Sequence, residues 1–137
     1  MITPKDVRIK FKTSQEQDGQ KDRQSKLLNG KRYERKGGQV LQFRDDEGED
    51  KVVCVVEIRE DEVTIRRSGT IESEMRFVQD EQQEFRHKNA FGCVYFRMHT
   101  KELQTNVTED VYDLRVVYDL ISGGAVISTN TVEITAK

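Results

Sequence analysis

The sequence has little of what marks a helical or a membrane-spanning protein. It contains one proline, and it has no run of about 18 apolar residues, the length that a membrane-spanning helix needs. Helical periodicity is almost absent as well. Neither sign of charge predominates, since 23 basic residues stand against 25 acidic ones. We therefore expect no membrane span, and the charge gives no reason to expect nucleic acid or a membrane surface as a partner.

Cysteine is scarce, and its placement bears on the compartment. Cys54 and Cys93 both lie in apolar, strand-like runs, and the first five residues are polar with no apolar signal region behind them. This pattern predicts a cytoplasmic protein with two reduced, buried thiols. A disulfide is the alternative, and it would need both side chains on one side of adjacent strands.

The dominant pattern is the alternation of apolar and polar residues. Val7, Ile9 and Phe11 alternate with basic residues, and the same period of two recurs in residues 39–45, 51–60 and 114–120. Such alternation is typical of strands with one buried face. Only 34% of the residues are hydrophobic and 35% are charged, which fits a thin core under a wet outer face. Residues 14–26 are polar without a period, and we expect a loop there, with a short helical turn as an alternative.

Short turns separate these strands. Glycine pairs at 37–38 and 123–124 and the polar pair Glu60-Asp61 are typical of hairpin turns. The sequence thus predicts one all-β domain over residues 1–137, an antiparallel meander of about 8–10 strands. Closing the meander into a β-barrel would hide both edges of the sheet. A β-sandwich is the competing arrangement.

Several stretches of this meander resemble a known family. They are Val40-Leu41-Gln42-Phe43-Arg44-Asp45, Val63-Thr64-Ile65-Arg66-Arg67-Ser68-Gly69, Met75-Arg76-Phe77, Phe85-Arg86-His87, Gly92, Thr100 and Leu114-Arg115-Val116-Val117-Tyr118-Asp119-Leu120. Over nearly the whole chain they are similar to the bacterial YwiB-type proteins, a family of unknown function. The resemblance implies a calycin-like (lipocalin-like) barrel and no known activity. Family members tend to carry Glu where this chain has Asp45, and Thr or a similar residue where it has His87.

Alternation also predicts which polar side chains enter the barrel. Extending the inward register of the apolar positions places an acid, a guanidinium, an imidazole and a phenol inside, namely Asp45, Arg67, His87 and Tyr118. We expect a ligand site in which Arg67 binds an anionic group and Asp45 orients Arg67. Its apolar walls would be Phe43, Phe85 and Phe96. The alternative is that Asp45 and Arg67 form a salt bridge at the rim and side chains fill the barrel.

No residue pattern commits to catalysis or to a metal. His87 and His99 are not spaced as zinc ligands are, and by parity His99 faces outward. There is no nucleophile elbow, and no phosphate or dinucleotide loop. The acidic segment 45–50 lacks the alternating ligands of a calcium loop, so we expect a solvated hairpin tip. We expect no catalytic residue, no metal and no cofactor.

Three functional hypotheses follow from this pattern. The first is a non-enzymatic barrel that binds a small apolar or amphipathic ligand in its lumen. The second is a protein-interaction module or homodimer that uses the outer surface or a strand edge. The third is an enzyme, which would need His87 to hydrogen-bond a carboxylate in an open cleft.

Overall fold

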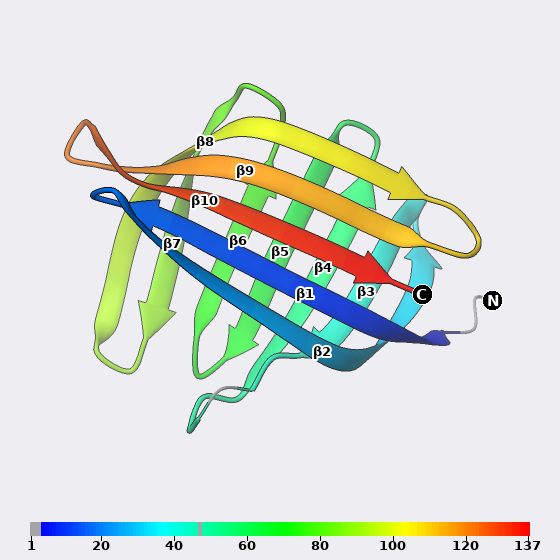
Figure 1. Ribbon diagram of the computed structural model, residues 1–137. Helices are drawn as coiled ribbons and strands as arrows, with labels where there is room; N and C mark the ends of the chain where they lie inside the picture. The colour runs from blue at the N-terminus through cyan, green and yellow to red at the C-terminus, as the bar shows by residue number, and fades with distance from the viewer. Residues whose placement is uncertain (1–3, 47) are drawn as a thin grey trace.

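The computed structural model describes residues 4–46 and 48–137, and Figure 1 shows them as a curved antiparallel sheet of ten strands. Residues 1–3 and 47, part of the polar N-terminus and of the acidic segment 45–50, lie outside the described residues. The strands are β1 (Lys5–Gln17), β2 (Gln20–Arg35), β3 (Gly38–Arg44), β4 (Val52–Arg59), β5 (Glu62–Gly69), β6 (Glu72–Phe77), β7 (Gln82–Asn89), β8 (Gly92–Val107), β9 (Tyr112–Ser122) and β10 (Ala125–Ala136).

The strands form a closed barrel, as the alternation predicts. Each strand pairs with the next one along the chain, and β1 closes the ring by pairing with β10. Main-chain bonds between Arg8 and Lys137, at 3.0 and 3.1 Å, extend this last pairing. The barrel is flattened, so that β1 and β8–β10 cross in front of β3–β7 in Figure 1. Within the described ranges there is no helix long and apolar enough to cross a membrane.

Residues 14–26 are not a loop, and this prediction was wrong. β1 continues to Gln17, and a two-residue turn at Asp18 and Gly19, with φ of 52° and 77°, leads directly into β2. Positive φ at both central residues is the geometry of the turn that best joins two twisted strands. The hairpin arm is exposed, with no residue of 15–25 buried. Apolar residues are therefore not needed on either face, and the alternation disappears.

The two ends of the barrel differ. At the end that carries the β2–β3, β4–β5 and β8–β9 turns, here called the closed end, large side chains fill the interior. The hydroxyl of Tyr112 lies 2.9 Å from the carbonyl oxygen of Val56 and 3.2 Å from that of Gln39. The guanidinium of Arg32 covers the Tyr112 ring, 5.8 Å from its centroid. The fully buried residues include Ile9, Leu41, Val63, Phe77, Met98, Tyr112, Leu114, Val116 and Ile134.

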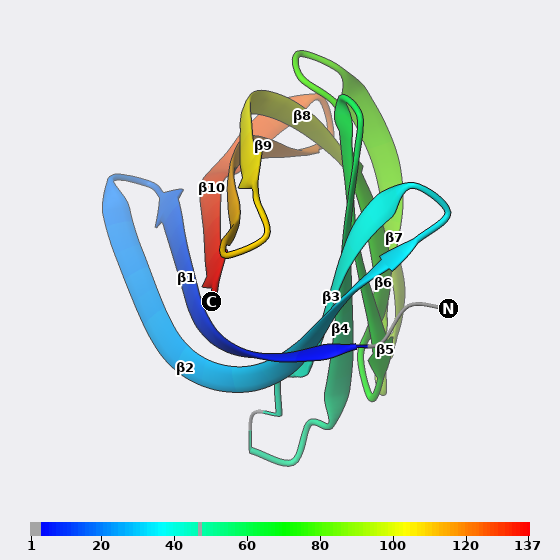
Figure 2. The same ribbon diagram turned by 90° about the vertical axis from the view of Figure 1, so that its right-hand side faces the viewer.

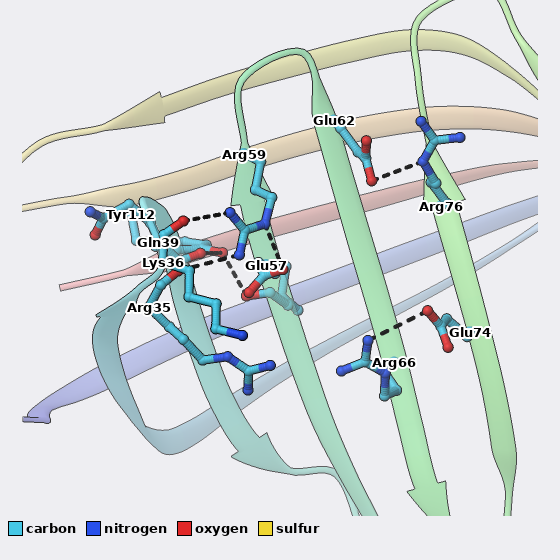
Figure 3. A network of polar contacts seen from close by, with 11 residues as sticks. Arg35, Lys36, Gln39, Glu57, Arg59, Glu62, Arg66, Glu74, Arg76 and Tyr112 are labelled. Carbon is cyan, nitrogen blue, oxygen red and sulfur yellow. Dashed lines mark hydrogen bonds and ion pairs between the residues drawn. The ribbon is translucent and has the colours of Figure 1, made fainter.

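On the outside of β4–β6, one ion pair lies within β4 and two link β5 to β6. Figure 3 shows Arg59 with Glu57 at 2.9 Å, Arg76 with Glu62 at 2.8 Å and Arg66 with Glu74 at 3.4 Å. The hydrogen bond from Arg76 lowers the pKa of Glu62. Pairs exposed to this degree contribute little to stability, and they are typical of a solvent-exposed surface.

Gly30 marks the point where β2 acquires its second neighbour. A Cβ at this position would lie 2.5 Å from Cδ1 of Ile9 and 2.6 Å from the carbonyl oxygen of Gln42. β2 pairs with β1 from Gln20 to Arg32 but with β3 only from Gly30 to Arg35. The close approach of three strands at this residue therefore requires glycine.

Candidate ligand site in the open half of the barrel

The opposite end of the barrel, here called the open end, carries a row of polar side chains on the inner face. Cys54 of β4 is registered with Arg67 of β5, Arg67 with Ser73 of β6, and Ser73 with His87 of β7. Side chains directly opposite on antiparallel strands have their Cβ atoms about 5 Å apart. The predicted inward positions of Arg67 and His87 are confirmed. The register adds Ser73 between these two residues and Cys54 on the other side of Arg67.

Asp45 lies just after β3 and closes one end of this row. Its side chain is only 9% exposed, and its Oδ1 accepts a hydrogen bond from Nζ of Lys26 at 2.7 Å. Its Oδ2 lies 4.0 Å from the guanidinium of Arg67. The expected meeting of Asp45 and Arg67 is thus present. Lys26 was missed because it falls in the segment that was expected to be a loop.

Arg67 keeps most of its hydrogen-bonding capacity. Its side chain is 31% exposed, and among the described residues its guanidinium contacts Asp45 and the thiol of Cys54. A guanidinium offers five N–H donors, so several of them have no acceptor within the described part of the chain. Burial raises the pKa of the Cys54 thiol, which the charge of Arg67 partly offsets. The thiol therefore stays protonated and adds no negative charge beside the arginine.

Tyr118 approaches the same space from β9, on the other side of the barrel. Its ring packs against Phe77 with centroids 5.2 Å apart. Burial raises the pKa of Tyr118 to about 12, and the positive charge of Arg67 opposes this shift. The neighbouring hydroxyl of Thr100 is buried without a hydrogen-bond partner in the described part of the chain. Hydroxyl groups thus face Arg67 across the interior.

Aromatic rings form the apolar walls, at the positions that alternation predicts. Phe85 and Phe96 stack with centroids 5.6 Å apart, and Phe43 packs edge to face with Phe11 at 5.6 Å. Phe43 and Phe85 are buried, whereas Phe96 is partly exposed toward the open end. These rings themselves fill part of the barrel interior.

A cavity of about 560 Å³ reaches the polar row from the side of the barrel. It is lined by Arg67, Ser73 and Phe85, whose side chains face inward, together with outward side chains of β5–β7. It lies where β6 and β7 share only two registered pairs, which end at Ser73 and His87. A second cavity, of about 180 Å³, lies between Tyr118, Gln24 and Asn130.

The turn between β6 and β7 is hydrogen-bonded to a third strand, β8. The amide of Asp80 donates to the carbonyl oxygen of Thr100 at 2.8 Å, and the amide of Thr100 donates to Glu81 at 3.1 Å. The turn is therefore bonded to β8, next to a bulge at Lys101, and not to its own strands. A bulge bends its strand at a barrel corner, and this bulge accompanies the short pairing of β6 with β7.

The histidines and cysteines do not form a second site. His87 is partly buried, and within the described ranges it makes no hydrogen bond to a carboxylate, which the enzyme hypothesis requires. His99 is registered with Asp119 on the outer face. In the same ranges no group of three potential ligands is placed to hold a metal ion. The two cysteines are free, and the prediction that both are buried was wrong for Cys93, which is exposed where β8 leaves its hairpin turn.

These features define the chain as a ten-stranded meander barrel with a polar cluster in one half of its lumen. Residues 9–134 match the family described as a domain of unknown function, DUF1934, and the chain belongs to that family. It is similar to the uncharacterised β-barrel protein YwiB of Bacillus subtilis (strain 168), with 25% identity over 117 residues, 85% of this chain and 82% of that protein. It also resembles the crystal structure of the ywiB protein from Bacillus subtilis, with a TM-score of 0.89 and 23% identity, over 98% of this chain and 92% of that one.

Proposed function

We propose that the barrel binds a small amphipathic anion, with its charged group at Arg67 and its apolar part against the aromatic wall. The single observation that carries this proposal is Arg67 itself. It is a partly buried guanidinium that contacts Asp45 and Cys54, lines a cavity, and has further N–H donors without a partner in the described part of the chain. A buried arginine usually has its donors filled by a carboxylate or phosphate in two-point contact.

The surroundings of Arg67 support the same ligand class. Asp45 lies on one side of the guanidinium and holds it, while Ser73 lies beside it in register and can donate a hydrogen bond to an anion. Phe85 and Phe96 provide an adjoining apolar surface. The cavity of about 560 Å³ falls in the usual size range of small-molecule sites, about 300–1,000 Å³. The site therefore offers one anion-binding position and room for a short apolar tail.

Native mass spectrometry of the purified protein, with a denatured extract as control, would detect a retained ligand. Isothermal titration with dodecanoate, and with dodecanol as the uncharged analogue, would test the chemistry. We expect dodecanoate to bind at least tenfold more tightly than dodecanol, because only the carboxylate can pair with Arg67. Absence of any retained molecule together with no dodecanoate binding would overturn the proposal, and so would equal affinity for the two probes.

A further inference from the structure

The first half of β2 is an open strand edge in an otherwise closed barrel. Residues 20–29 pair with β1 on one side, whereas β3 pairs only with Gly30 to Arg35 on the other. In Figure 2 β2 is the outer strand of the β1–β2 hairpin, whose inner strand, β1, pairs with β10. Residues 20–25, 27 and 29 are exposed. A long edge of this kind is a template for pairing with another strand.

The hairpin geometry identifies the main-chain groups that the edge presents. A two-residue turn makes Gln17 and Gln20 a hydrogen-bonded pair. Bonding then alternates, so every second residue of β2 from Gln20 bonds to β1. The residues between them direct both N–H and C=O to the free side, namely Lys21, Arg23, Ser25, Leu27 and Asn29. Further along β2, the same alternation bonds Arg35 to β3 through the next two-residue turn.

The outer face of this hairpin is strongly basic although the chain carries a net charge of −2. Lys21 and Arg23 lie on the open edge itself, and Asp6 is the acid that pairs with Lys31, at 2.6 Å. Glu16 is the other acid on this face. The register places the following seven cations on it: Arg8, Lys10, Lys12, Lys21, Arg23, Lys31 and Arg35. A partner strand would thus meet a positive surface.

We propose that the open edge of β2 binds an extended acidic peptide segment of another protein, which adds as a strand beside residues 21–29. The edge offers N–H donors and C=O acceptors in alternation, and an extended peptide matches both. A nucleic acid backbone would use the donors and leave the carbonyl groups unpaired. A second copy of this chain, added antiparallel, would bring a second basic face beside the first, and the two positive surfaces would repel each other.

The register of the edge specifies the sequence of the partner. The outward side chains beside an added strand are Lys21 and Arg23, then Ser25, then Leu27, which is 63% exposed. An antiparallel partner would pass Leu27 first and Lys21 last. Its outward positions should therefore read apolar, small, acidic, acidic, each separated by one residue.

Synthetic peptides with this pattern test the proposal directly. The probe is a fluorescein-labelled Val-Thr-Ser-Thr-Glu-Thr-Glu peptide, and the control peptide carries Lys in place of both Glu residues. Fluorescence anisotropy should show at least tenfold tighter binding of the acidic peptide. Amide hydrogen exchange should slow at Lys21, Arg23, Ser25 and Leu27 when the acidic peptide is bound.

Two matched pairs of variants locate the binding. Ser25→Pro removes an edge N–H that no strand of the barrel uses, so it should weaken binding at least tenfold, while Ser25→Thr should not. Lys21→Gln with Arg23→Gln should weaken binding similarly, while Arg66→Gln with Arg86→Gln, on another face, should not. Thermal unfolding shows whether each variant is folded. If Ser25→Pro is not folded, the comparison of Lys21→Gln with Arg23→Gln against Arg66→Gln with Arg86→Gln decides the question.

Three results would overturn this assignment. The first is equal binding of the acidic and basic peptides. The second is a single-stranded oligonucleotide that binds more tightly than the acidic peptide and is insensitive to Ser25→Pro. The third is a dimer in sedimentation equilibrium that Ser25→Pro converts to monomer, which would assign the edge to a second copy of the chain.

Discussion

Arg66 and Arg67 are adjacent in β5 but lie on opposite sides of the barrel wall. Arg66 pairs with Glu74 at 3.4 Å on the outside, where its side chain is 48% exposed. Arg67 faces the lumen beside Asp45 and Cys54. The two residues carry the same charge on the same strand, but only Arg67 belongs to the polar row of the inner face.

Replacing Arg67 should abolish anion binding in the lumen. We expect Arg67→Gln to weaken dodecanoate binding at least tenfold, because the carboxylate loses a charged, two-point partner. Arg8 lies on the outer face of β1 and does not line the cavity of about 560 Å³ at Arg67, so Arg8→Gln should leave the affinity unchanged. Isothermal titration of both variants gives the comparison, and equal losses in the two would refute the assignment of Arg67.

Asp45 should matter more for stability than a comparable surface acid. Asp45→Ala leaves Lys26 and Arg67 partly buried without the carboxylate, and we expect a loss of about 2 kcal/mol in the free energy of unfolding. Asp6 also pairs with a lysine, at 2.6 Å, but its side chain is 84% exposed. Asp6→Ala should therefore have little effect. Urea denaturation measures both, and similar losses would show that burial is not the deciding factor.

The burial of Tyr118 predicts how stability changes in alkali. Its pKa is about 12 in the folded chain and about 10 when unfolded. Between these values the unfolded chain has lost the phenol proton and the folded chain has kept it. Stability is complete below pH 10 and falls as the pH rises toward 12, by at most about 1.4 kcal/mol per pH unit from this residue.

Tyr118→Phe should make that alkaline decline less steep. Urea unfolding at pH 8, 10 and 11 measures the slope for the variant and for the parent chain. Tyr112, whose pKa is also raised by burial, is present in both and cancels in the comparison. Parallel slopes would contradict a buried, protonated Tyr118.

Gly30 should tolerate no side chain. Gly30→Ala forces a Cβ against a main-chain oxygen and Ile9, and we expect a loss of about 2 kcal/mol or more. At Gly38 a Cβ would meet only flexible side-chain atoms of Arg59 and Glu57, at 3.2–3.3 Å. Gly38→Ala should be much milder. Thermal denaturation of the two variants tests the difference, and equal effects would disprove the close approach at Gly30.

The sequence predicts the inner face well because one face of each central strand is buried. Alternation places Phe43, Phe85 and Arg67 inside, and the register agrees. The prediction from alternation fails in residues 14–26, where both faces of the hairpin are exposed to solvent and neither face requires apolar residues. That failure hid Lys26, the partner of Asp45, since its position depends on pairing with Phe11 across the hairpin.

Other features depend on pairing between distant segments, which no local pattern records. The ladder between β6 and β7 has only two pairs, and the turn between these strands is hydrogen-bonded to Thr100 of β8. The net charge likewise conceals the basic face of the β1–β2 hairpin. Its cations are interleaved with acids along the chain, and only the register separates them in space.

The pairing of β1 with β10 also sets the order in which the barrel forms. Ile9 is registered with Ala136, so the contact that closes the ring joins residues from opposite ends of the described chain. Such distant pairing slows folding. During synthesis the first strand must wait, with one edge unpaired, until the last has left the ribosome. Until then the unpaired edge of β1 is available to chaperones and to mispairing.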